Sequence, residues 1–300
     1  MKAASVTAKS TAQFRFRLRD FLELAKPEVT SLIVLSTLAG FYLGTRGQLD
    51  FSLLLHTLLG TALVAGGTGA LNQFVERSTD ARMRRTAQRP LPAGRMHPAM
   101  GLAYGSGLAA AGIAYLLLLV NPLASLLALL TLASYLLLYT PLKKRTHLCT
   151  LVGAFPGAMP PLIGWAAAQN QLTLEAWVLY GILFLWQFPH FFAIAWLYRD
   201  DYARGGIIML PAVDPSGRAT FQQIVAYSAL LLPMSVLPSL LGLAGTLYLW
   251  SAVLLGLSFL AVGVWGSLSR TTRRARYLLH ASILYLPALF GLLMFDKQVH

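Results

Sequence analysis

The residues that could carry out metal-dependent chemistry gather in two short acidic clusters. The first runs from Asn72 to Pro90 and contains Asn72, Glu76 and Asp80, each four residues from the next. At about 100° per residue, these three side chains would share one face of a helix. Mg²⁺ prefers such oxygen ligands and needs only one or two carboxylates when a ligand supplies phosphate oxygens. Because arginines in the same cluster can donate to phosphate, it predicts a magnesium and diphosphate site.

The second cluster repeats this combination of acids, arginines and glycines. It reads Tyr198-Arg-Asp-Asp-Tyr202-Ala-Arg204-Gly-Gly, and its acids are Asp200 and Asp201. We expect the two clusters to face each other and hold a diphosphate between two metal-binding faces. A lipid tail attached to that diphosphate would then lie in the bilayer. The alternative is that arginines at helix ends pair with nearby carboxylates and bind no ligand.

The composition indicates which solvent surrounds these clusters. Of 300 residues, 56% are hydrophobic and only 12% are charged, which excludes a water-soluble enzyme. The formal net charge of +13 does not indicate nucleic acid, because the basic residues lie in short clusters between long apolar runs, as beside anionic lipid. Cys149 is the only cysteine, so there is no intrachain disulfide.

Nine apolar stretches approach the roughly 20 helical residues that a hydrocarbon core of about 30 Å requires. The sequence therefore predicts an all-α polytopic membrane protein, with nine transmembrane helices in a bundle around a central cavity that opens to the cytoplasmic side. We expect one nine-helix domain over residues 29–296, after a basic cytoplasmic segment over residues 1–28. The expected spans are Val29–Gly44, Phe51–Gln73, Pro98–Val120, Pro122–Tyr139, Leu148–Ala168, Leu174–Leu197, Phe221–Leu241, Leu247–Gly266 and Tyr277–Phe295.

The basic residues predict the orientation of the spans. Every Lys and Arg except Arg46 and Lys297 falls on one side of the membrane in this arrangement. Because loops rich in Lys and Arg stay in the cytoplasm, we expect a cytoplasmic N-terminus in a bacterial inner membrane. The alternative is the mitochondrial inner membrane, since residues 1–28 have some features of a transit peptide; residues 14–24 could instead form an amphipathic helix on the membrane surface.

Several motifs resemble the intramembrane prenyltransferase superfamily of the UbiA type. The resemblance covers nearly the whole chain, and its last motif resembles the branch that farnesylates heme rather than the branches that prenylate quinone precursors. The motifs are Ala25-Lys-Pro-Glu-Val-Thr30, Asn72 to Pro90, Tyr139-Thr-Pro-Leu-Lys-Lys144, Gly153 to Trp165, and Trp186-Gln-Phe-Pro-His190-Phe leading to Tyr198-Arg-Asp-Asp-Tyr202.

This resemblance implies an enzyme and its substrates. It implies transfer of the farnesyl group of farnesyl diphosphate to the 2-vinyl group of heme b, with water supplying a hydroxyl, to give heme O and diphosphate. Mg²⁺ is the implied cofactor. The implied partners are farnesyl diphosphate, heme b and membrane lipid, and pathway logic adds a heme A synthase or a terminal oxidase that receives the product.

The resemblance also implies roles for particular residues. The metal and diphosphate role falls on Asn72, Glu76, Asp80, Asp200 and Asp201. The implied cationic partners are Arg77, Lys143, Arg199 and Arg204. Beside these motifs, Phe74, Trp186, Tyr198 and Tyr202 could stabilise an allylic cation by cation–π attraction.

Two positions depart from the family pattern. Many bacterial members have Asp where this chain has Glu76, which keeps the carboxylate but lengthens the side chain by one methylene. The family usually has Asn where this chain has Cys149, and a thiol neither donates two hydrogen bonds nor binds Mg²⁺ well. We therefore expect the sulfur to pack rather than to take a polar role.

His190 lies inside the sixth expected span, 11 residues before Asp201. In a continuous helix, 11 residues return to within about 20° of the same face, so we expect His190 to face the same cavity as Asp201. There an imidazole could bind heme iron or transfer a proton. The alternative is a neutral histidine hydrogen-bonded between helices.

Other functions remain open from the sequence. A prenyltransferase of the same fold that acts on a quinone precursor or a chlorin ring would have a similar diphosphate site. A transporter is disfavoured because the acids cluster at one membrane surface rather than at the midplane and no inverted repeat is visible. A purely structural membrane subunit would tolerate replacement of Asp80 and Asp201 by Asn.

Overall fold

The computed structural model of this chain describes residues 18–298. Regular structure in this range is helical, with one isolated bridge between Ala244 and Lys297. Nine helices of the described part are long and apolar enough to cross a membrane, which confirms the predicted all-α class and the number of spans. Residues 1–17 of the expected basic segment, including the start of the expected amphipathic helix, lie outside the described residues.

Most spans begin and end within three residues of their predicted bounds, but the second continues seven residues further than predicted and the ninth begins five residues earlier. Short helices precede the first span and connect the sixth to the seventh. The spans are α2 (Pro27–Gly44), α3 (Phe51–Asp80), α4 (Pro98–Leu119), α5 (Pro122–Ala133) with η1 (Ser134–Tyr139) and α6 (Thr140–Leu142), α7 (Cys149–Gly157) with α8 (Pro160–Gln169), α9 (Leu174–Leu197), α12 (Arg218–Leu240), α13 (Thr246–Ser269) and α14 (Thr272–Phe295). The short helices are α1 (Leu18–Leu24), α10 (Arg199–Gly205) and α11 (Leu210–Val213).

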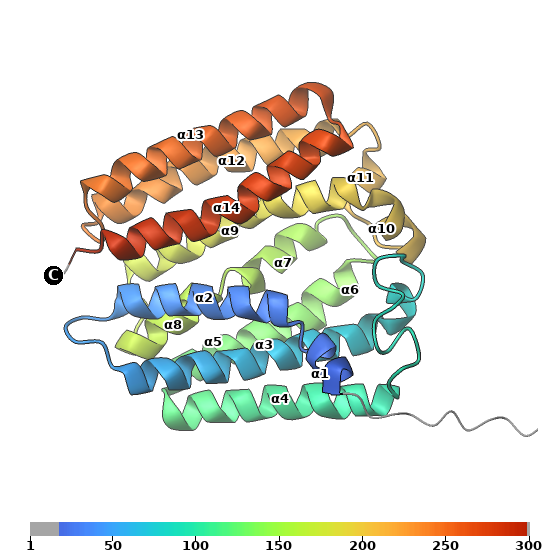
Figure 1. Cartoon of the computed structure of the whole chain (residues 1–300), viewed down its shortest axis with the longest axis horizontal. Helices are drawn as coiled ribbons and strands as arrows, with labels where there is room; N and C mark the ends of the chain where they lie inside the picture. The colour runs from blue at the N-terminus through green and yellow to red at the C-terminus, as the bar shows by residue number, and fades with distance from the viewer. Residues whose placement is uncertain (1–17, 299–300) are drawn as a thin grey trace, which may run out of the picture.

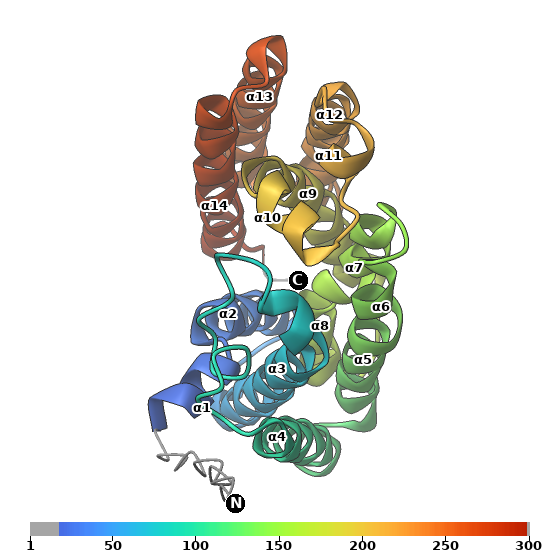
Figure 2. The ribbon, with the colours of Figure 1, turned by 90° about the vertical axis from the view of Figure 1, so that its right-hand side faces the viewer.

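The helices form two groups that run along the long axis of the molecule (Figure 1) and lie one above the other in Figure 2. One group contains α2 to α8, and the other contains α9 with α12, α13 and α14. Small residues let helices touch within the first group. A Cβ on Gly67 of α3 would lie 2.5 Å from the backbone nitrogen of Ala109 on α4, so a side chain there would push these helices apart.

Two spans are not continuous α-helices. The fourth span passes through the π-helical turn η1 before α6, and the fifth is interrupted between α7 and α8, where Pro156 and Pro160 remove backbone donors. A π-helical turn inserts an extra residue into a helix and occurs frequently at functional sites. Here it precedes Thr140 and Lys143, two residues of the cluster described below.

The sixth span ends before the second acidic cluster. α9 ends at Leu197, Tyr198 has non-helical torsion angles (φ −111°, ψ 23°), and α10 begins at Arg199 as a separate helix. The prediction that His190 and Asp201 lie on one face of a continuous helix is therefore wrong. A projection at 100° per residue does not extend across a break in the helix.

Candidate active site

Asn72, Glu76 and Asp80 line the last turns of α3, and we call them the polar column. α3 has 30 residues, so it continues beyond the predicted end at Gln73 and carries all three on one face. Each is buried, with 1%, 8% and 1% of its surface exposed. Asn72 Nδ2 donates to Glu76 Oε2 at 3.0 Å. The predicted shared helix face is thus confirmed.

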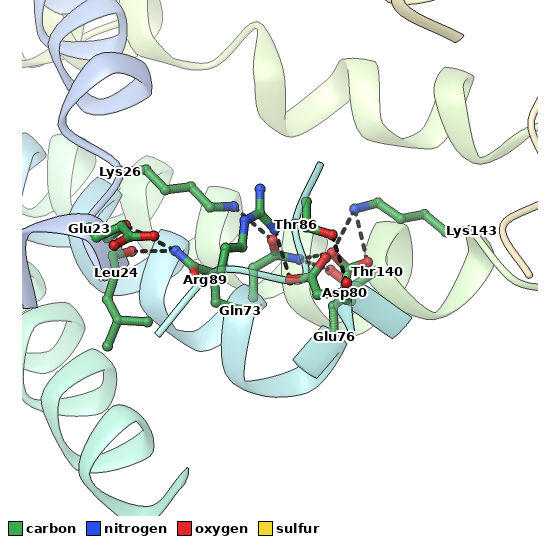
Figure 3. Close-up of polar contacts among 11 residues, drawn as sticks. Glu23, Leu24, Lys26, Gln73, Glu76, Asp80, Thr86, Arg89, Thr140 and Lys143 are labelled. Carbon is green, nitrogen blue, oxygen red and sulfur yellow. Dashed lines mark hydrogen bonds and ion pairs between the residues drawn. The ribbon is translucent and has the colours of Figure 1, made fainter. Parts of the chain in front are cut away.

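A cation from another segment contacts each member of the polar column (Figure 3). Lys26 Nζ donates to the Asn72 amide oxygen at 3.0 Å. Lys143 Nζ lies 3.0 Å from the glutamate carboxylate, and Arg89 Nη1 lies 2.8 Å from the aspartate carboxylate. Three cations therefore face two carboxylates. The excess positive charge favours binding of a polyanion such as diphosphate.

Local backbone features position these cations. Lys26 is the N-cap of α2 and has a left-handed conformation (φ 49°), directly before Pro27, which starts the helix with a preset φ. Lys143 follows the π-helical turn and α6. In α6, Thr140 donates to the carbonyl of Tyr135 at 2.8 Å and accepts from Asn72 Nδ2 at 3.3 Å, which fixes this segment against α3.

The electrostatic environment acts most strongly on Lys26. Burial, together with the nearby charges of Arg89 and Lys143, lowers the pKa of Lys26 to about 7, against the opposing effect of the two carboxylates. An anion bound beside this amine would favour its charged form again. The site is thus an incompletely neutralised cluster of cations.

Lys26, Arg89 and Thr140 were not among the predicted site residues. Lys26 lies in the motif Ala25–Thr30 and Arg89 in the cluster Asn72–Pro90, so both were in segments that carried a signal. Neither belongs to the helical spacing that identified the polar column. Lys26 and Arg89 contact the polar column because the tertiary fold brings their segments back against α3.

Asp201 connects the second acidic cluster to the first through the backbone. Its two carboxylate oxygens accept from the backbone N–H groups of Arg84 and Arg85 at 3.0 and 3.1 Å, and it forms an ion pair with Arg204. Burial alone would raise the pKa of Asp201, but these donors outweigh it and hold the pKa below its usual range. Since Arg84 and Arg85 follow Asp80 closely, Asp201 fixes the turn that leaves the polar column.

Three other predicted residues do not join the polar column. The side chain of Asp200 is 83% exposed and its Oδ1 lies 4.0 Å from Arg199 Nε. Arg77 and Arg199 each donate to the backbone carbonyl three residues earlier in the chain. Arg77 is one residue beyond Glu76, and a rotation of about 100° takes it off the buried face. Of the predicted cationic partners, the structure places Lys143 at the polar column.

The aromatic residues of the second cluster lie beside an arginine. The guanidinium of Arg85 is 5.1 Å from the centre of the Tyr198 ring and 5.9 Å from that of Tyr202. A ring that the sequence did not identify lies at the polar column itself, because Lys143 Nζ is 4.5 Å from the centre of the Tyr139 ring. This ring contributes an aromatic face next to the cations.

His190 lies on α9 and faces α14. Its Nδ1 is 2.8 Å from Ser282 Oγ, whose own hydrogen is donated to the carbonyl of Leu279. With the Ser282 hydrogen directed to Leu279, Nδ1 donates the ring hydrogen to Oγ and Nε2 keeps its lone pair. Trp186 stacks on the ring at 4.8 Å. Among the described residues Nε2 has no hydrogen-bond partner, so this nitrogen is suited to bind a metal or accept a proton.

Cys149 is fully buried and packs, as expected from its departure from the family pattern. Its neighbours form a small apolar cluster, and its sulfur lies 3.9 Å from that of Met209. It takes no part in the polar column.

The donor chemistry of the polar column fits Mg²⁺. In residues 18–298 no group of three His, Cys, Asp or Glu side chains is close enough to hold a metal alone. Mg²⁺ does not need such a group, because phosphate oxygens and water complete its shell. One amide and two carboxylates on a single buried face supply hard oxygen ligands for an ion that arrives with a diphosphate.

Comparisons with known proteins agree with these features. The UbiA prenyltransferase family matches residues 33–287. A protoheme IX farnesyltransferase of Solibacter usitatus is 53% identical over 289 residues, covering 93% of this chain and 99% of the relative. A protein of the same name from Salinibacter ruber is 50% identical over 279 residues, covering 93% of this chain and 99% of the relative. Another from Koribacter versatilis is 47% identical over 292 residues, covering 94% of each chain.

Solved structures show the same fold at low sequence identity. A structure described as digeranylgeranylglyceryl phosphate synthase has a TM-score of 0.78 at 16% identity, covering 93% of this chain and 98% of the other. A UbiA homolog from Archaeoglobus fulgidus bound to GPP and Mg²⁺ has a TM-score of 0.65 at 14% identity, covering 91% and 99%.

Proposed function

The chain belongs to the UbiA prenyltransferase family, and we propose that it transfers the farnesyl group of farnesyl diphosphate to the 2-vinyl group of heme b, with addition of water. The products are heme O and diphosphate. The identity of 53% to a protoheme IX farnesyltransferase across 99% of that relative's length carries this proposal. The cations around the polar column support the diphosphate half of the reaction.

Charge development explains the composition of the site. The bond between C1 of the farnesyl chain and the diphosphate oxygen breaks with both electrons on oxygen, so negative charge grows on the leaving group. Lys26, Lys143 and Arg89 would bind the diphosphate and stabilise this charge. The polar column would hold Mg²⁺, which when bound supplies Lewis-acid stabilisation of the same charge. The Tyr139 face would lie beside the positive charge that develops on carbon.

The second acidic cluster has a supporting role in this proposal. Asp201 positions the turn after Asp80 through its bonds to Arg84 and Arg85, rather than contributing a second pair of metal ligands. Tyr202 and Arg204 belong to the same framework, since one lies beside Arg85 and the other pairs with Asp201.

We assign the heme side of the site to His190. Its tautomer leaves the Nε2 lone pair free, and Ser282 together with the stacked Trp186 ring holds the imidazole in one orientation. Bound to heme iron through Nε2, His190 would fix the macrocycle beside α9. This would let the vinyl group meet the allylic carbon in one geometry.

We also propose a location and an orientation for the protein. Among residues 18–298, Arg46 and Lys297 are the only Lys or Arg residues in the loops on one side of the nine spans, which favours a cytoplasmic N-terminus in a bacterial inner membrane. Residues 29–296 would then form one membrane domain with the polar column at its cytoplasmic end. Reporter enzymes fused to the C-terminus test this orientation. A reporter that is active only outside the cytoplasm should be active in the fusion, and a reporter that is active only in the cytoplasm should be inactive.

The reaction can be tested with purified protein in detergent. Heme b, farnesyl diphosphate and Mg²⁺ should give a heme product whose mass has increased by one farnesyl group and one hydroxyl, and EDTA should abolish it. Asp80→Asn should lower the rate by about a hundredfold, because it removes one charge from the metal ligands. Asp50→Asn is the matched control, since Asp50 caps the opposite end of the same helix.

Two outcomes would count against the proposal. Prenylation of 4-hydroxybenzoate without any heme product would retain the prenyltransferase but refute heme as acceptor. Equal activity of the Asp80→Asn and Asp50→Asn proteins would refute the assignment of the polar column.

A further inference from the structure

A groove lies between the start of α12 and the end of α13, away from the polar column. Its cavity has a volume of about 560 Å³. Arg218 and Gln222 of α12 and Ser267 and Arg270 at the end of α13 form its polar part. Phe221 lies in its apolar wall together with Val225 and Ala226. We call this cavity the α12–α13 groove.

The two arginines of the groove are not neutralised by neighbouring groups. Among the described residues, neither guanidinium has an ion-pair partner within 4 Å, whereas Arg89 and Arg204 each have one and Arg95 has two. Asp214 is a carboxylate that interacts electrostatically with Arg270, because the charge of Arg270 helps to lower the pKa of Asp214. Its oxygens already accept from Ser216 and from the backbone N–H of Ala219. Both guanidinium groups therefore keep free donors.

The position of the groove suits a lipid headgroup. α12 begins and α13 ends at the end of the bundle that carries α10 and α11 (Figure 1), which is also the end where Asp201 contacts the loop after α3. The arginines thus lie at the level of a membrane surface, and the apolar wall extends from them along α12 into the hydrocarbon region. Basic pockets between transmembrane helices bind anionic lipid headgroups in this manner.

We propose that the α12–α13 groove binds the phosphate of an anionic phospholipid. Arg218 and Arg270 donate to the phosphate oxygens, in the planar geometry that makes arginine a better phosphate ligand than lysine. Gln222 and Ser267 supply polar contacts to the headgroup. An acyl chain lies along the apolar wall at Val225 and Ala226. This proposal does not depend on the substrate of the enzyme.

Native mass spectrometry of the full chain in neutral detergent tests the proposal with phosphatidylglycerol as the probe. The unmodified protein should bind phosphatidylglycerol more tightly than phosphatidylcholine of the same chain length. Arg218→Gln with Arg270→Gln should weaken binding by about 30-fold, the loss expected when two arginines are removed from an anionic lipid site.

The matched control is Arg273→Gln with Arg276→Gln, which removes two arginines from the start of α14, at the same end of the bundle, without changing a residue of the groove. It should change the dissociation constant by less than threefold. If it weakens binding as much as the groove variant does, only general surface charge is involved and the proposal is refuted. Unchanged binding by the groove variant also refutes it.

Two further measurements separate related explanations. If the double Gln variant does not fold, Arg218→Lys with Arg270→Lys keeps both charges and should still weaken binding severalfold, because lysine lacks the two-pronged contact. Inorganic phosphate should not displace phosphatidylglycerol at millimolar concentration. Full displacement would show a free-anion site and overturn the assignment to lipid.

Discussion

Replacing Arg89 with glutamine should impair the enzyme far more than replacing Arg77 with glutamine. The two changes remove the same side chain and the same charge from the same motif. Arg89 Nη1 lies 2.8 Å from the buried carboxylate of Asp80. Arg77 is exposed and donates to the carbonyl of Phe74, with its guanidinium 4.6 Å from that ring. The family motif points to Arg77, whereas the structure points to Arg89.

The expected magnitudes follow from these surroundings. A hydrogen bond to a charged group contributes about 1.5–3 kcal/mol, so losing the Arg89 contact with diphosphate should lower kcat/KM by roughly 10- to 150-fold. Because Arg89 is 24% exposed, water partly compensates for its loss, and the lower half of that range is the better expectation. An exposed side chain such as Arg77 contributes about 0.5 kcal/mol or less, which corresponds to less than about threefold.

The assay measures kcat/KM for farnesyl diphosphate at saturating heme b and Mg²⁺, with the melting temperature of each variant as a check on folding. A loss confined to the Arg89 variant supports the observed cluster. Equal losses in two folded variants would refute it, because a side chain turned back on its own helix would then be as important as one that reaches the polar column. A larger loss in the Arg77 variant would restore the motif-based assignment.

Three further changes test other parts of the structure. Asp201→Asn should lower kcat/KM by tenfold or more and speed proteolysis within residues 81–97, because it weakens the contacts with the backbone of Arg84 and Arg85. The control Asp200→Asn should change kcat/KM and the rate of proteolysis by less than threefold. Larger effects in the Asp200 variant than in the Asp201 variant would contradict the role of Asp201 in fixing this turn. His190→Ala should abolish the Soret shift that accompanies heme binding without changing the dissociation constant for farnesyl diphosphate, and an unchanged heme spectrum would exclude His190 as ligand. The pKa of Asp214 is lowered first by its hydrogen bond with Ser216 and then by the Ala219 N–H. The contribution of Asp214 to stability is therefore complete above its unfolded pKa of about 4 and is lost as the pH falls through the folded pKa. The difference in melting temperature between the unmodified protein and Asp214→Asn should stay constant from about pH 8 to 5 and shrink below about pH 4.

The sequence predicted those features that depend on local periodicity. The length of an apolar run determines whether a helix can cross a bilayer, so all nine spans could be predicted, most of them to within a few residues. A spacing of four residues puts Asn72, Glu76 and Asp80 on one helix face whatever the rest of the chain does. Their burial followed because this face of α3 turns toward Lys26, Lys143 and Thr140.

Features that depend on a break or a long-range contact were not predictable in this way. The non-helical torsion of Tyr198 separates α9 from α10, and none of residues 190–210 is proline, the usual sign of a break. As a result, Asp200 points to the surface, and Asp201 bonds to backbone N–H groups more than 100 positions earlier. A backbone N–H is present at almost every residue, so composition and spacing carry no signal for this contact.

The ion pairs of the polar column are better explained by ligand binding than by stability. Removing charged groups from water costs several kcal/mol for each ion, and a buried ion pair seldom stabilises a fold more than well-packed apolar residues would. Here the carboxylates of Glu76 and Asp80 are buried with cations from separate segments, while the amine of Lys26 has its pKa lowered to about 7 by burial and by neighbouring positive charge. An arrangement that disfavours the charged form of one amine is electrostatically incomplete. A diphosphate with its metal would complete it, since the phosphate oxygens satisfy the cations while the metal takes the carboxylates.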